Sequence, residues 1–131
     1  MTKPTNLALW ILQLLLAVIF AKAGAMKTCT PMIELATQMH WVYYTPEGAV
    51  RLLGYLEIMG AFGLIFPAAT RVWSIVTPIA ALCLAVLMGL AVIVHLVHDE
   101  SSAIGIPLAL AMIALVVAWG RFRIEPIQTR Y

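Results

Sequence analysis

The sequence predicts an all-α integral membrane protein of one domain, built as a bundle of four transmembrane helices. Of the 131 residues, 63% are hydrophobic and only 11% are charged, whereas soluble domains have about 45–50% apolar and about 25% charged residues. Four long apolar runs leave little chain for any water-soluble domain. The composition argues against a soluble enzyme domain and a disordered tail, and the scattered basic residues exclude a nucleic-acid binder.

The four predicted spans are continuous apolar runs with few polar interruptions. A spanning helix needs roughly 17–25 mostly apolar residues, and the runs do not alternate as the strands of a membrane β-barrel do. The runs comprise residues 7–25, 52–69, 72–97 and 103–120. We therefore expect a single membrane domain over residues 1–131.

Tryptophan and proline residues mark the ends of the predicted spans. Trp10, Trp73 and Trp119 lie near the ends of three runs, as in the aromatic belts at membrane interfaces. Pro67 is predicted to end the second span. Pro78 would fall near the start of the third span, where a proline removes few helical hydrogen bonds.

The longest connection, residues 26–51, has its own pattern. Residues 32–39 can form a short amphipathic helix, and Trp41, Tyr43 and Tyr44 follow it closely. Because aromatic side chains favour the membrane interface, we expect this connection to lie on the membrane surface.

Lysine and arginine residues favour one orientation in the membrane. With four spans, both termini lie on the same side, which would carry five basic residues against three on the other side. The five are Lys3, Arg71, Arg121, Arg123 and Arg130, and the three are Lys22, Lys27 and Arg51. Since cytoplasmic loops carry an excess of such residues, we predict a multi-pass protein of the cell (inner or plasma) membrane with both termini cytoplasmic.

Three ionisable side chains inside the runs are the candidates for a polar site: Lys22, Glu57 and His95. Ionisable groups inside a membrane are costly and mark functional sites by default. At about 1.5 Å per residue, each lies within about 10 Å of the outer interface, so three helices would contribute to one polar layer. A Lys22–Glu57 pair could simply fix helix packing, or Glu57 could bind a ligand or take part in proton transfer.

His95 leaves similar alternatives open. It could hydrogen-bond Glu57, contact a quinone carbonyl, or reach the lipid head groups. His95 and His98 are three residues apart, which is weak evidence for a metal site, and we predict none. A haem needs axial ligands on facing spans, and His95 is the single histidine inside a run. The sequence pattern leaves the catalytic residues unknown.

Small residues predict where helices approach one another closely. Glycine and alanine at spacings of three and four residues let neighbouring membrane helices pack tightly. The residues that we assign to helix packing are Gly54, Gly60, Ala81, Ala85 and Gly89.

Three segments, in order, resemble a known family. The second span reads LGYLEIMGAFGLIFP over residues 53–67, a Gly-x-x-Glu-x-x-Gly core followed by a proline. The third span ends AVIVH at residues 91–95, and the fourth ends AWGR at residues 118–121. Over residues 7–121 the sequence resembles the DoxX and DoxX-like family of small four-helix integral membrane proteins.

The resemblance implies a fold and a functional context. The family is named for a membrane subunit associated with a thiosulfate:quinone oxidoreductase, and distant relatives resemble assembly chaperones for membrane receptors. The family's Lys, Glu and His positions match Lys22, Glu57 and His95 here. The resemblance also implies that the first span is retained, although Ala21, Ala23 and neighbouring small residues look like a signal-peptidase site.

Two main functions follow as hypotheses. In the first, the chain is a membrane subunit of a quinone-linked redox complex, in which Glu57, Lys22 and His95 bind the quinone head group or relay its protons. Since the sequence has no flavin, haem or iron–sulfur motif, the electron donor would be a soluble or membrane redox partner. In the second, the chain is a non-enzymatic membrane partner or assembly chaperone. A small-solute transporter is less favoured because no broken helix or internal repeat is evident. Besides the lipid bilayer, partners and oligomeric state stay open.

Overall fold

The computed structural model describes residues 3–130, and every regular element in that range is a helix. Four of the helices are long and apolar enough to cross a membrane. These are α1 (Pro4–Cys29), α3 (Glu47–Thr70), α4 (Val76–Val97) and α5 (Gly105–Trp119), the last extended by a π-helical turn, η3 (Gly120–Ile124). The predicted all-α fold with four spans is confirmed.

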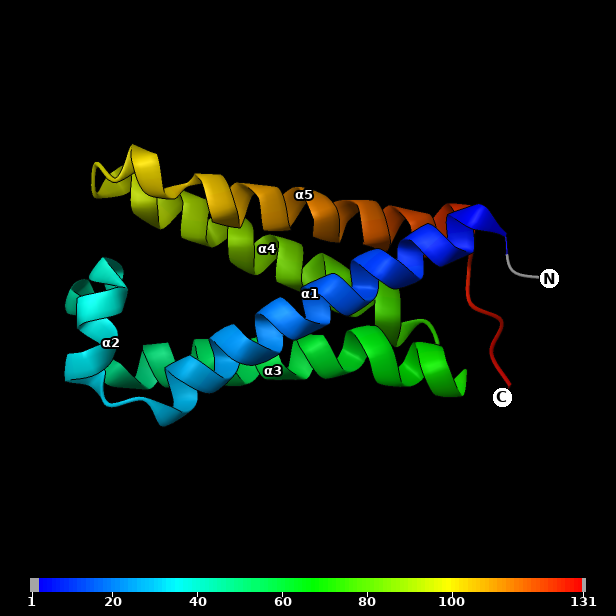
Figure 1. The fold of residues 1–131 in the computed structure, drawn as a ribbon, viewed down its shortest axis with the longest axis horizontal. Coiled ribbons are helices and arrows are strands. Elements are labelled where there is room, and N and C mark those ends of the chain that lie inside the picture. Colours follow the sequence, from blue (N-terminus) through cyan, green and yellow to red (C-terminus); the bar gives the residue numbers. More distant parts are fainter. Residues whose placement is uncertain (1–2, 131) are drawn as a thin grey trace.

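The four long helices form two pairs that diverge toward one end. α1 lies along α3, and α4 lies along α5 (Figure 1). The pairs approach each other at the end of the bundle that holds both ends of the described chain. At the opposite end, the short helix α2 (Met32–Gln38) and the 3-10 helix η1 (His40–Tyr44) occupy the connection between α1 and α3. The predicted short helix in this connection is therefore present.

Helices α1 and α3 extend beyond the predicted apolar runs into the polar residues that flank them. α1 begins three residues earlier and ends four residues later than the run 7–25, and α3 begins at Glu47 rather than at residue 52. Such polar turns are absent from a hydropathy pattern because the pattern detects only the hydrocarbon core. α4, by contrast, begins at Val76 rather than at residue 72. The preceding turn holds Arg71 and Trp73 at positive φ angles of 58° and 50°.

The prediction that Pro67 ends the second span is wrong. Pro67 lies inside α3, which continues to Thr70. A proline has no N–H for the carbonyl four residues earlier, which belongs to Gly63, and the hydroxyl of Thr77 donates to that oxygen at 3.2 Å. The side-chain amide of Gln13 donates to the next carbonyl, of Leu64, at 2.7 Å. Donors from neighbouring helices thus let the helix pass through the proline, as in other membrane bundles.

Two glycines set the contact between α1 and α3. A Cβ added at Gly24 would lie 2.5 Å from the Gly54 carbonyl oxygen, and a Cβ at Gly54 would lie 2.8 Å from the Gly24 carbonyl oxygen. The two backbones therefore touch at this point, which residues with a side chain would prevent. Gly54, predicted to lie at a helix contact, thus lies in one together with Gly24.

Three of the other four residues assigned to helix packing lie close to neighbouring side chains or in the core. An added Cβ at Gly60 would meet the side chain of Leu84, and Ala81 and Ala85 are buried in the main apolar core. Gly89 has no neighbouring atom within 4 Å of an added Cβ. The packing prediction for Gly89 is therefore wrong, because a side chain at this position would point into open space.

Candidate functional site

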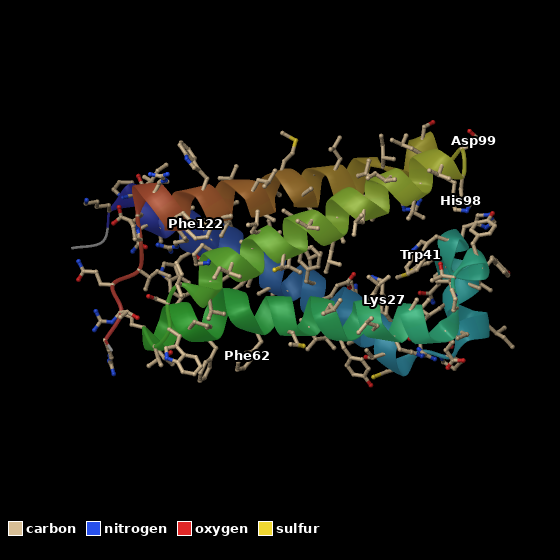
Figure 2. The ribbon with its side chains drawn as sticks, turned by 180° about the vertical axis from the view of Figure 1, so that it is seen from behind. Lys27, Trp41, Phe62, His98, Asp99 and Phe122 are labelled. Carbon is tan, nitrogen blue, oxygen red and sulfur yellow. The ribbon has the colours of Figure 1, made fainter. Side chains whose placement is uncertain are left out.

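A cavity of about 630 Å³ lies where the two helix pairs diverge. All four long helices line it, and the α2–η1 segment contributes His40 and Trp41. Figure 2 shows Trp41 reaching from this segment toward the space between the pairs. The volume falls within the range of about 300–1,000 Å³ that is typical of small-molecule sites. Most of the lining side chains are aliphatic, so the cavity suits a largely apolar ligand.

A buried ion pair forms the polar wall on the α1–α3 side. The ammonium of Lys27 donates to both carboxylate oxygens of Glu57, at 2.8 and 2.9 Å. The two side chains are only 10% and 4% exposed, and both line the cavity. The ring of Trp41 lies 5.9 Å from the ammonium, close enough for a cation–π contact. The pair therefore faces an apolar, aromatic environment.

The predicted partner of Glu57 is wrong: the structure pairs it with Lys27, whereas Lys22 is exposed. With about 100° per residue, positions 22 and 27 lie about 140° apart around α1, so they face different directions. The contact between Gly24 and Gly54 determines that Lys27 pairs with Glu57. Each of these charged residues follows its glycine by three positions and so lies beside the contact.

The sequence feature that indicates Lys27 as the partner of Glu57 is the same spacing on the two helices. Gly24-x-x-Lys27 on α1 mirrors Gly54-x-x-Glu57 on α3. Since residues three apart share a helix face, glycines in backbone contact bring the two charged side chains together. Sequence analysis missed this pair because the apolar run was ended at residue 25, which placed Lys27 in a loop.

The end of α1 is closed by an arginine from α3. Arg51 donates to the carbonyl oxygens of Lys27 and Thr30 at 2.9 and 2.6 Å, and it lies 3.6 Å from the carboxylate of Glu47. A cation near the last carbonyls of a helix is favourable because it opposes the helix dipole. Arg51 therefore holds the helix end that positions Lys27.

A second polar pair lies on the α4 side of the cavity. His95 Nδ1 and Glu100 Oε2 are 2.7 Å apart, and both side chains are largely buried. An ionised carboxylate can only accept, so the Nδ1–H of His95 donates to it. His40 Nε2 lies 3.9 Å from the other oxygen of Glu100 and accepts or donates a bond with the Tyr44 hydroxyl at 2.8 Å.

Glu100 was not among the predicted site residues. α4 ends at Val97, and Asp99, with a φ of 57°, turns the chain back. The N–H of Glu100 then donates to the carbonyl of His95 at 2.7 Å. Sequence spacing could not show this reversal, because a non-glycine residue at positive φ leaves no clear pattern.

The predicted outer polar layer is thus partly realised. Glu57 and His95 line the same cavity from two helix pairs, and Lys22 does not reach it. Lys27 and Glu100 complete the set. Within residues 3–130, no group of His, Cys, Asp or Glu side chains is placed to hold a metal ion.

Four spans with a polar-walled cavity at one end define a small multi-pass integral membrane protein. A family model described as DoxX-like family matches residues 11–117, and the chain belongs to this family. The matched range includes all four residues of the cavity's polar pairs. No curated protein and no solved structure matches the sequence.

Proposed function

We propose that this chain is the membrane subunit of a quinone-linked redox complex, and that the cavity binds the quinone head group. The observation that carries the proposal is the placement of hydrogen-bonding groups on two sides of an apolar cavity. Lys27 and Glu57 lie on the α1–α3 side, and His95 and Glu100 lie on the α4 side. A quinone ring is apolar, with two carbonyl oxygens on opposite edges, so its chemistry matches this arrangement.

Each pair has a donor to offer. An ammonium has three N–H groups, and Lys27 uses two of them on Glu57. His95 uses its Nδ1–H on Glu100, so its Nε2 accepts from a quinol hydroxyl when the ring is neutral and donates to a quinone carbonyl when the ring is protonated. Trp41 would cover one face of the ring. A bound quinone supplies two-electron, two-proton redox chemistry, and the electrons would pass to or from a partner protein with a flavin, haem or iron–sulfur group.

We place both termini in the cytoplasm, and the cavity therefore toward the outer face of the cell membrane. Lys3, Arg71, Arg123 and Arg130 belong to the segments at the terminal end of the bundle, as does Arg121. Excess positive charge on one side favours the cytoplasmic orientation. Reporter fusions at residue 130 and in the α2–η1 segment test this topology, and a periplasmic or external signal from residue 130 would contradict it.

Quinone binding can be measured through Trp41. In a variant with Trp10, Trp73 and Trp119 replaced by Phe, Trp41 is the remaining tryptophan. In phosphatidylcholine nanodiscs we expect a benzoquinone with one isoprenoid unit to quench its fluorescence saturably. An analogue without the two carbonyls should quench weakly. Quenching that rises linearly with quinone concentration would contradict the proposal, because it would indicate collisions in the bilayer only.

The polar contact is tested by His95→Gln. Loss of one charge-assisted hydrogen bond, about 1.5 kcal/mol, should raise the Kd about tenfold. His98→Gln is the matched control because His98 is exposed and should change the Kd less than twofold. Equal effects of the two substitutions would argue against a contact between His95 and the ring.

The redox complex itself is tested by purification from native membranes in mild detergent. We expect a stoichiometric flavin, haem or iron–sulfur protein and bound quinone by mass spectrometry. Recovery of a membrane client protein without quinone would contradict the proposal and favour the assembly-chaperone alternative.

A further inference from the structure

Arg121, at the end of the bundle opposite the large cavity, is a buried cation held by neutral groups. Its side chain lies in the π-helical turn η3 and is 3% exposed. Its Nε donates to Gln13 Oε1 at 2.6 Å, and its Nη1 donates to Asn6 Oδ1 at 2.7 Å and to the Glu125 carbonyl at 3.1 Å. Among the ion pairs of residues 3–130, none includes Arg121.

One nitrogen of this guanidinium is left without an acceptor. Nη2 is buried and has no hydrogen-bond partner in the described part of the chain. Buried donors without partners are unfavourable, and a buried charge is tolerated when an opposite charge or several acceptors surround it. An anion beside the guanidinium would supply the missing acceptor and add to the negative charge of the nearby Glu125 carboxylate.

A second cavity lies directly beside Arg121. Its volume is about 120 Å³, and Arg121 lines it together with Ser74, Phe122, Pro126 and Ile127. This volume accommodates a single small polar group rather than a whole lipid or cofactor. Arg121 is the one charged side chain that lines this cavity.

The walls of this cavity are tied together by hydrogen bonds. The Ser74 hydroxyl donates to the Ile127 carbonyl at 2.9 Å. The N–H of Arg130 and the hydroxyl of Thr129 donate to the Arg71 carbonyl at 2.7 and 3.2 Å. The segment after η3 is thus fastened to the turn between α3 and α4, and the cavity is a built feature of the fold.

The surroundings are positively charged and border the lipid. Besides Arg121, this end carries Lys3, Arg71, Arg123 and Arg130, and Glu125 is its single carboxylate among residues 3–130. Phe122, which lies at this end of the bundle (Figure 2), is exposed, as is Ile75 on the rim. Basic pockets between membrane helices bind the head groups of anionic lipids.

We propose that this cavity binds the phosphate of an anionic phospholipid. The phosphate would accept from Arg121 Nη2, and the exposed Phe122 and Ile75 would contact the glycerol and the first part of an acyl chain. The apolar rim distinguishes a lipid phosphate from free phosphate, which would gain nothing from these side chains. The site lies at the opposite end from the proposed quinone cavity, so the two proposals stand independently.

The wild-type protein tests the proposal without any substitution. In detergent with added phosphatidylglycerol or phosphatidylcholine, native mass spectrometry should show one retained phosphatidylglycerol, with an apparent affinity at least about tenfold higher than that for phosphatidylcholine. The Tm should rise with the anionic lipid and not with 10-fold molar excess of inorganic phosphate. Equal retention of the two lipids would overturn the proposal, and an equal rise with inorganic phosphate would assign the site to the free ion instead.

Two variants locate the site. Ile127→Trp fills the cavity while leaving the contacts of Arg121 with Gln13 and Asn6 in place, and it should lower the affinity for phosphatidylglycerol about tenfold. Arg123→Gln removes an exposed positive charge at the same end and should change the affinity less than twofold. If Arg123→Gln weakens binding as much as Ile127→Trp does, the attraction is a general effect of charge and the proposed site is wrong.

Discussion

Replacing Lys27 and Glu57 together, by Met and Leu, separates a functional pair from a structural one. Both side chains are nearly buried and use each other as hydrogen-bond partners. Removing one member leaves an unpaired charge inside the protein, which costs about 3–5 kcal/mol. Replacing both by apolar groups of similar size is about neutral, or stabilising by about 1–4 kcal/mol. Met retains the aliphatic stem of Lys27 that packs beside Gly54.

The assay is thermal unfolding of the three variants in one detergent, followed by circular dichroism. We expect Lys27→Met and Glu57→Leu each to lower the Tm strongly, and the double variant to recover most of the loss. The coupling free energy from the double-mutant cycle should exceed about 2 kcal/mol, at the upper end of the values for residues in contact. Lys22→Met is the control, because an exposed lysine should change stability by less than about 0.5 kcal/mol.

The same double variant is then tested for quinone binding by Trp41 fluorescence. A folded, stable protein that has lost saturable quenching would show that the pair serves the ligand rather than the fold. Two results would refute the reasoning. Additive destabilisation in the double variant would mean that the two charges do not compensate each other, and unchanged quenching would remove the pair from the quinone site.

Two further substitutions test the packing that positions the site. Thr77→Val removes the hydroxyl that replaces the missing N–H of Pro67 and should lower stability by about 0.5–2 kcal/mol. Thr70→Val is the control in the same thermal assay, because the Thr70 hydroxyl donates within its own helix, to the Phe66 carbonyl; equal effects would argue against the role of Thr77. Gly24→Ala places a Cβ 2.5 Å from a facing backbone oxygen and should cost about 1–3 kcal/mol. Gly48→Ala, with no atom within 4 Å, should not destabilise.

The number and order of spans could be predicted from the sequence because they depend on composition over about twenty residues. The features that the sequence did not predict depend on single contacts between residues far apart in the chain. Pro67 does not end α3 because a hydroxyl on another helix supplies its lost hydrogen bond. Hydropathy contains no information on such a contact, whereas proline alone predicts a break.

The sequence predicted that Glu57 and His95 lie at a similar depth in the membrane, but it did not predict which residues they pair with. Glu57 and His95 do face one cavity, since their depth follows from helix rise alone. Their partners depend on tertiary geometry: Lys27 on the glycine contact between α1 and α3, and Glu100 on the turn at Asp99. A search for matched small-x-x-charged spacings on two runs would have found the first partner from the sequence.

The two ends of the bundle differ in how closely the helix pairs approach each other, and Gln13 connects the pairs at the closed end. Its amide donates to the Leu64 carbonyl of α3, and its oxygen accepts from Arg121 at the end of α5. A single buried side chain on α1 therefore joins three helices at the terminal end. Because this end is held by polar contacts and a close contact of Gly120 with Leu9, the helix pairs can diverge at the other end without losing the fold. At the open end each pair keeps its own contacts, such as that between Gly24 and Gly54, and the space between the pairs forms the large cavity.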